Sequence, residues 1–153
     1  MREAYIAFGS NIGEPEKNVR EAYEALSLVP GIKPDKLSKM YITKPWGYTD
    51  QPDFTNACCK VLTSLSPEAL LGVCLGIEAA MGRVRTIKNG PRVIDIDLLM
   101  YEGEERNTAE LVLPHPRMLE RTFVLEPLSD LTSDGYVLGT DIAAALARLN
   151  GEQ

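Results

Sequence analysis

Residues 89–100 read NGPRVIDIDLLM, and two acids stand two positions apart in a run that is otherwise apolar. An extended chain alternates its faces, so Asp95 and Asp97 share one face with Val93 and Leu99. The opposite face carries Ile94, Ile96, Leu98 and Met100. The pattern predicts a strand with its even-numbered face in the core. Like charges in a partly dry site repel, so a metal ion, an arginine or solvent should lie against the two acids.

The composition is that of one globular domain, which we expect to cover residues 1–153. With 44% apolar and 25% charged residues, a chain of this length can bury its own core. The N-terminal sequence lacks a signal-peptide layout. The longest uncharged apolar stretch of the whole chain, residues 69–77, is too short to span a bilayer. We therefore expect a cytoplasmic protein without a membrane partner, and a monomer in preference to a homodimer.

Charge and cysteine content argue against several classes of protein. The net charge of −6 and the pI near 4.9 argue against a nucleic-acid partner. Three cysteines, two of them adjacent at Cys58 and Cys59, accompany a single histidine. This set favours neither a disulfide framework nor a structural zinc site, so we expect the cysteines to pack as small apolar residues.

The order of predicted elements indicates an α+β fold. Apolar spacing predicts strands at residues 3–9, 37–43 and 54–63, then the strand that carries the two acids. Helices are predicted at 15–28, with Pro15 in the first turn, and from the N-cap Ser66 to Gly82. This order is the ferredoxin-like βαββαβ sandwich, an antiparallel sheet with two helices. Additional C-terminal helices are predicted near 122–130 and, capped by Thr140, near 141–149.

A basic segment precedes the acidic strand. Residues 79–94 contain no acid, and their four cations are Arg83, Arg85, Lys88 and Arg92. Guanidinium groups bind phosphate, and carboxylates with water and phosphate oxygens suit Mg²⁺, so the combination favours a metal-nucleotide complex. The alternatives are a solubilising loop and a solvated acidic face. FGSNIG at 8–13 matches neither common phosphate-loop motif, which favours ordinary turn glycines at Gly9 and Gly13.

Two further groups are candidates for ligand contact. Phe54 and Asn56 share one face of their strand, where an aromatic ring and an amide can stack on a flat heterocycle and bond its edge. The alternative for Phe54 is a core position. His115, between two prolines and followed by Arg117 and Arg121, could reach phosphate.

The segments together resemble the 6-hydroxymethyl-7,8-dihydropterin pyrophosphokinase family. In chain order the matching pieces are YIAFGSNIG, TKPWGYTDQPDFTNA, IEAAMGRVR, GPRVIDIDLLMY, LPHPRM and RTFVLEPL. The most specific part is GPR-x-x-D-x-D-x-L with GR-x-R upstream and PH downstream. The resemblance implies transfer of the β,γ-diphosphate of ATP to the pterin hydroxymethyl group, with release of AMP.

The resemblance also implies roles for individual residues. Asp95 and Asp97 would hold two Mg²⁺ ions, and Arg83 and Arg92 would contact the transferring diphosphate as catalytic residues. The implied ATP-binding residues are Glu78, Arg83, Arg85, Arg92, His115 and Arg121. The implied pterin-binding residues are Thr43, Pro45, Trp46, Phe54, Asn56 and Phe123, with the two phenylalanines sandwiching the ring.

Some features depart from the family pattern or leave alternatives open. Asn89 stands where an aromatic residue is frequent, residues 86–89 form a short loop, and Phe54 stands where tyrosine is also common. We expect residues 44–53 and 83–92 to close over bound substrates. The rival interpretations are a metal-dependent hydrolase or nucleotidyltransferase, and an RNA-binding module on the sheet.

Overall fold

A five-stranded antiparallel sheet forms the centre of the molecule. The structure is a computed structural model that describes residues 1–45, 49–82 and 91–151. The strands of the sheet are β1 (Arg2–Ser10), β2 (Ile32–Leu37), β3 (Tyr41–Thr43), β4 (Phe54–Thr63) and β5 (Asp95–Tyr101). Their order is β2-β4-β1-β5, and β3 also pairs with β4.

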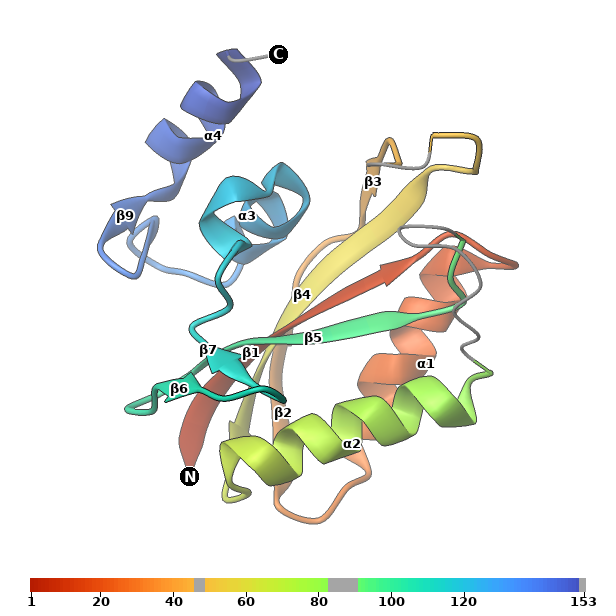
Figure 1. Cartoon of the computed structure of the whole chain (residues 1–153), viewed down its shortest axis with the longest axis vertical. Helices are drawn as coiled ribbons and strands as arrows, with labels where there is room; N and C mark the ends of the chain where they lie inside the picture. Colours follow the sequence, from red (N-terminus) through yellow and green to blue (C-terminus); the bar gives the residue numbers. More distant parts are fainter. Residues whose placement is uncertain (46–48, 83–90, 152–153) are drawn as a thin grey trace.

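Helices cover both faces of this sheet (Figure 1). On one face lie α1 (Pro15–Ser27) and α2 (Pro67–Ala80), which enclose a core with the apolar side chains of β1, β4 and β5. On the other face lies α3 (Thr122–Ser129), and α4 (Ile142–Gly151) packs against α3 on its far side, within a second apolar cluster. The described residues therefore form an α+β structure with an antiparallel sheet and four α-helices.

Local signals fix the limits of the long elements. Ser66 caps α2 because its Oγ accepts the N–H of Ala69 at 3.1 Å, and Pro67 occupies the first turn, where no helical N–H is needed. The predictions of β4 and of the start of α2 are confirmed, and those of β1 and α1 are confirmed to within one residue at each end. None of the helices in the described part of the chain is long and apolar enough to cross a membrane.

The predicted strand at residues 37–43 is wrong, because two short strands, β2 and β3, share this edge. Ser38 interrupts the regular ladder: its N–H donates to Cys58 O, and its Oγ accepts the N–H of Cys58, both at 2.9 Å. The polar sequence of β2 includes Pro34, which an edge strand tolerates. An edge strand with mostly exposed side chains gives little apolar alternation to read.

Strand β5 follows the predicted alternation up to a bulge. Ile6 pairs with Leu98 while Tyr5 pairs with Met100, so Leu99 is the extra residue. Ile94, Ile96 and Leu98 are buried as predicted. The prediction that Met100 faces the same core is wrong, because the bulge turns it to the α3 face and brings Tyr101 into that core.

Short elements complete the C-terminal part. They are β6 (Arg106–Asn107), β7 (Val112–Leu113), a 3-10 turn at Met118–Glu120, β8 (Tyr136–Val137) and β9 (Thr140–Asp141). Helices α3 and α4 confirm the two predicted C-terminal helices. Thr140 was predicted to cap α4, but it lies in β9, and the carboxylate of Asp141 accepts the N–H of Ala144 instead.

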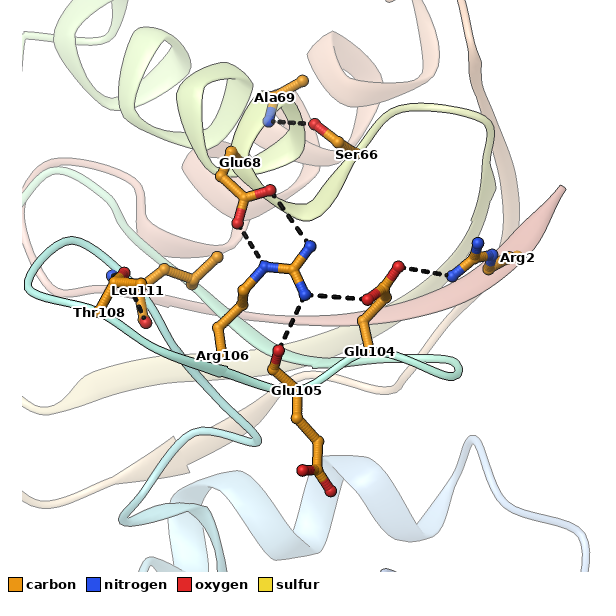
Figure 2. Close-up of polar contacts among 9 residues, drawn as sticks. All are labelled: Arg2, Ser66, Glu68, Ala69, Glu104, Glu105, Arg106, Thr108 and Leu111. Carbon is orange, nitrogen blue, oxygen red and sulfur yellow. Dashed lines mark hydrogen bonds and ion pairs between the residues drawn. The ribbon is translucent and has the colours of Figure 1, made fainter.

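An ion-pair network joins the far end of β5 to α2 and β1 (Figure 2). Arg106 donates from Nε and Nη2 to Glu68 at 2.6 and 3.3 Å, and from Nη1 to Glu104 at 2.9 Å. Glu104 also accepts from Arg2 Nη1 at 2.8 Å. These four side chains, which we call the Arg106 cluster, connect three segments that are distant in the sequence.

Candidate active site

The floor of the candidate site is the α3-facing side of β4, β1 and β5. Gly9 in β1 pairs with Asn56 on one side and with Asp95 on the other. A Cβ at Gly9 would lie 3.2 Å from Asn56 Oδ1, so glycine leaves room above the strand. The expectation that Gly9 is a turn residue is therefore wrong, whereas Gly13, with φ of 72°, lies in the bend after β1.

A cavity of about 120 Å³ lies over this floor. One end brings together Thr43, Phe54 and Asn56 with Phe123 at the start of α3. The other end brings together Arg92, Asp95, Asp97 and Arg121. The remaining lining residues are Ala7, Phe8, Gly9, Lys44 and Val124. Eight of the implied site residues, Thr43 among them, thus line one cavity.

The amide of Asn56 is oriented by its neighbour across the strand pair. Asn56 Nδ2 donates to Thr43 Oγ1 at 2.6 Å, while Oδ1 lies above Gly9. Phe54 is the register partner of Thr43. This end of the cavity therefore offers an acceptor oxygen beside aromatic side chains.

The two acids project from one face of β5, as the alternation predicts. Burial is the main cause that raises the pKa of Asp97 to about 7, and the charge of Asp95 adds to it. Arg121 and Arg92 act in the opposite direction. Because burial and repulsion outweigh these cations, the ionised form of Asp97 is disfavoured in the protein alone.

Arg92 is fixed by contacts on its backbone and its side chain. Its Nη1 donates to Asp95 Oδ2 at 2.9 Å, and its N–H donates to Asn11 Oδ1 at 2.8 Å. Asn11 also donates from Nδ2 to Gln51 Oε1 at 2.8 Å and to Pro52 O at 3.0 Å. Within the described residues, the buried Nε of Arg92 has no acceptor, so it remains available to a ligand oxygen.

Glu78 and His115 lie against β5 but differ in their surroundings. Glu78 is buried at the end of α2, where Oε2 accepts the N–H of Ile96 at 2.8 Å. The backbone of His115 donates to Leu99 O at 2.8 Å. Burial and then the charge of Arg121 lower the pKa of His115, so its ring is mainly neutral near pH 7.

The remaining predicted site residues do not line the cavity in the described part of the chain. Trp46, Arg83 and Arg85, together with Lys88 and Asn89 of the basic segment, lie outside the described residues. Pro45 directly follows Lys44, which lines the cavity. Sequence reasoning missed Lys44 and Asn11. An asparagine directly after a strand, in SNIG, was the available signal for Asn11.

The amino-acid sequence matches a known family model and known enzymes. The family model of 7,8-dihydro-6-hydroxymethylpterin-pyrophosphokinase (HPPK) matches residues 5–133. A 2-amino-4-hydroxy-6-hydroxymethyldihydropteridine pyrophosphokinase of Methylorubrum extorquens is 48% identical over 98% of this chain and 95% of its own length. The enzyme of the same name from Bacillus subtilis is 44% identical over 84% of this chain and 77% of its own length.

Solved structures support the fold. A crystal structure of HPPK-DHPS in complex with substrates has a TM-score of 0.76, with 14% identity and 99% of this chain covered. A triple mutant of Plasmodium falciparum HPPK-DHPS with pteroate gives 0.73 at 15% identity, again over 99% of this chain. The present chain spans 44% of each of those chains. The sequence matches show that this chain belongs to the HPPK family.

Proposed function

We propose that this protein transfers the β,γ-diphosphate of ATP to the hydroxymethyl group of 6-hydroxymethyl-7,8-dihydropterin, a step of folate biosynthesis. The products are the pterin diphosphate and AMP. In a member of the HPPK family, the observation that carries the proposal is one cavity with an aromatic and amide end joined to an arginine and carboxylate end. A flat heterocycle and a polyphosphate require this combination.

The aromatic end suits the pterin. Phe54 from β4 and Phe123 from α3 both line the cavity, so two separate elements supply aromatic side chains for contact with the pterin ring. Asn56 Oδ1 can accept an N–H of the pterin edge, because the bond from Nδ2 to Thr43 orients the amide with its oxygen above Gly9. Backbone groups near Pro45 and Trp46 would contact the rest of this edge.

The charged end suits the triphosphate. Arg92 and Arg121 line it, and His115 lies next to Arg121. We assign Arg92 to the transferring diphosphate, where a fixed guanidinium stabilises charge that develops during transfer. Arg121, His115 and Glu78 are assigned to ATP, as are Arg83 and Arg85, with Arg83 also on the diphosphate.

The donor set fits magnesium. Asp95 and Asp97 provide oxygen ligands on one face of β5. In the described part of the chain, no group of three or more His, Cys, Asp or Glu side chains is placed to hold a metal ion by itself. Mg²⁺ often uses one or two carboxylates and fills its other positions with water and phosphate. We propose that these acids hold two ions, which when bound would neutralise phosphate charge and acidify the substrate hydroxyl.

The chain itself contributes mainly positioning. The walls of the cavity hold the hydroxymethyl group beside the diphosphate, and the arginines keep the phosphates in line for displacement. Closure of residues 44–53 and 83–92 would exclude water and stays a prediction, and residues 46–48 and 83–90 of these segments lie outside the described part of the chain. A change in hydrogen exchange at residues 49–53 on joint binding of an ATP analogue and pterin would support it.

A product analysis tests the proposal. The protein is incubated with ATP and the pterin, with Mg²⁺ or with a chelator, and the products are identified by mass spectrometry. We expect AMP and pterin diphosphate in equal amounts, only with the metal. ADP, or phosphate release that does not depend on the pterin, would instead indicate the hydrolase alternative. Transfer that persists with the chelator would contradict the metal assignment alone.

Several expectations stay predictions. If β2 and β3 count as one interrupted strand, the strand order matches the ferredoxin-like arrangement, and we propose this topology. A single domain over residues 1–153, a cytoplasmic location, the monomeric state and the absence of nucleic-acid and membrane partners also stay predictions.

A further inference from the structure

Asp130 links the two walls of the pterin end of the cavity. It follows the last residue of α3, and its carboxylate accepts the hydroxyl of Tyr41 in β3, at 3.0 Å to Oδ1 and 2.9 Å to Oδ2. Oδ2 also accepts the N–H of Lys39 at 3.0 Å. Helix α3 carries Phe123 and strand β3 carries Thr43, so the link joins the elements that bear opposite walls.

Helix α3 is poorly suited to hold its position alone. It has eight residues and contains Pro127, which has no N–H to donate to the carbonyl of Phe123 one turn earlier. Short helices are marginal without tertiary packing. Near its start, Val124 O lies 3.8 Å from the buried thiol of Cys58. The contacts of Asp130 provide a second anchor, at the opposite end of the helix.

The placement of an acid at this position supports the same role. A negative charge at a helix C-terminus opposes the helix dipole and is disfavoured there. The contacts with Tyr41 and Lys39 offset this cost, and they are the only hydrogen bonds by which described residues attach the Asp130 carboxylate to the edge of the sheet. An apolar or basic residue at 130 could not make them.

The edge of the sheet transmits this contact to the cavity. Tyr41 pairs directly with Asn56 across the strands, and Thr43, two residues further along, holds the Asn56 amide. A shift between β3 and α3 would therefore change the distance from the amide and Phe54 on one wall to Phe123 on the other.

We propose that Asp130 and Tyr41 are positioning residues that set the width of the pterin slot by fixing α3 against β3. Neither residue lines the cavity. The identity of the ligand in this inference rests on the proposed function. The expected signature is a loss of pterin affinity that exceeds any loss of ATP affinity, because Arg121 directly precedes α3 but Arg92 is anchored separately through Asn11 and Asp95.

Four variants test the proposal through ligand binding. Tyr41→Phe and Asp130→Ala remove the link, Asp130→Asn can preserve both contacts, and Tyr136→Phe is a matched control on the exposed C-terminal hairpin. Calorimetry should give a pterin Kd raised about tenfold in the first two variants, and within about twofold of the parent in the others. The KM for ATP should change by less than about twofold in all four. Unchanged pterin affinity in folded Tyr41→Phe, or equal weakening of pterin and ATP, would overturn the proposal.

A second measurement does not depend on the ligand. The amides of Val124 and Leu125 both donate to Arg121 O at 3.0 Å, so their hydrogen exchange reports on the first turn of α3. We expect faster exchange at both amides in ligand-free Tyr41→Phe and no change in Tyr136→Phe. If the parent protein forms no AMP, the proposed function fails, and this arm still decides the link. Unchanged exchange would then overturn it.

Discussion

Two clusters of acids and arginines lie at opposite ends of β5, and they differ in how well their charges are balanced. In the Arg106 cluster, the exposed carboxylate of Glu68 and the partly exposed carboxylate of Glu104 contact arginines, and hydrogen bonds from Arg106 lower the pKa of both acids. In the site cluster of Arg92, Asp95 and Asp97, burial and repulsion raise the pKa of Asp97 to about 7.

This difference separates a structural role from a ligand-binding role. The Arg106 cluster satisfies its charges internally and in contact with water, so it needs no further partner and contributes modestly to stability. The site cluster keeps a carboxylate whose charged form is disfavoured by the protein alone. Such a group is retained when a cationic ligand completes its surroundings.

The largest expected effect is on turnover. Asp97→Ala should lower kcat by about a thousandfold or more, because the proposed metal loses a ligand. Glu104→Ala, the matched change in the Arg106 cluster, should leave kcat within about twofold and lower only the Tm. Quantified AMP release and a melting curve measure both. Retained Mg²⁺-dependent turnover in folded Asp97→Ala would contradict the metal assignment.

The next effect separates the two arginines. Arg92→Ala should lower kcat by about a hundredfold while the pterin Kd changes by less than about threefold, since contact with moving phosphate is felt mainly in the transition state. Arg106→Ala should alter neither quantity. Steady-state kinetics with calorimetry decides this. An equal loss of pterin affinity in Arg92→Ala would contradict the assignment of Arg92 to the transferring diphosphate and would indicate contact with the pterin.

The sequence predicted the elements whose signals are local. Strand β4 was predicted at its observed limits because a β-branched and apolar run ends at clear turn residues. Strand β2 was missed because an exposed edge has no apolar alternation. Met100 was assigned to the wrong face because a bulge interrupts the two-residue period, and nothing in DIDLLMY indicates where pairing with β1 slips.

Among the candidate site residues, too, the sequence indicated those with a local signal and missed those defined by distant contacts. Asp95, Asp97 and Asn56 became candidates because acids and amides are unusual in apolar strands, and Phe54 became one because it shares a strand face with Asn56. Asn11, Lys44 and Asp130 were missed because their importance depends on contacts with segments about forty to ninety positions away. Such contacts are a property of the assembled sheet and cannot be read from neighbouring residues.

The smallest expected effect is on the pH dependence of the free energy of unfolding, and its sign differs between the site cluster and the Arg106 cluster. The raised pKa of Asp97 means that the native state binds its proton more tightly than the unfolded chain does, so this group stabilises the fold fully below about pH 4 and loses that contribution as the pH rises through about 7. In chelator, Asp97→Asn should therefore be more stable than the parent at pH 8, by about 1–3 kcal/mol, and similar to it at pH 4.

Glu104→Gln should show the opposite trend. The lowered pKa of Glu104 gives a contribution that is present above its ordinary pKa and is lost as the pH falls, so the variant should be slightly less stable than the parent at pH 8 and equal to it at about pH 3. Added salt should shrink this difference, because solvent reaches the ion pairs of Glu104 with Arg2 and Arg106, and it should affect the more buried Asp97 much less. Denaturant unfolding at the three pH values measures both variants. If the free energies of unfolding of the two variants, relative to the parent, changed with pH in the same direction, the two clusters would be electrostatically alike, and Asp97 would have no greater need of a cationic ligand than Glu104.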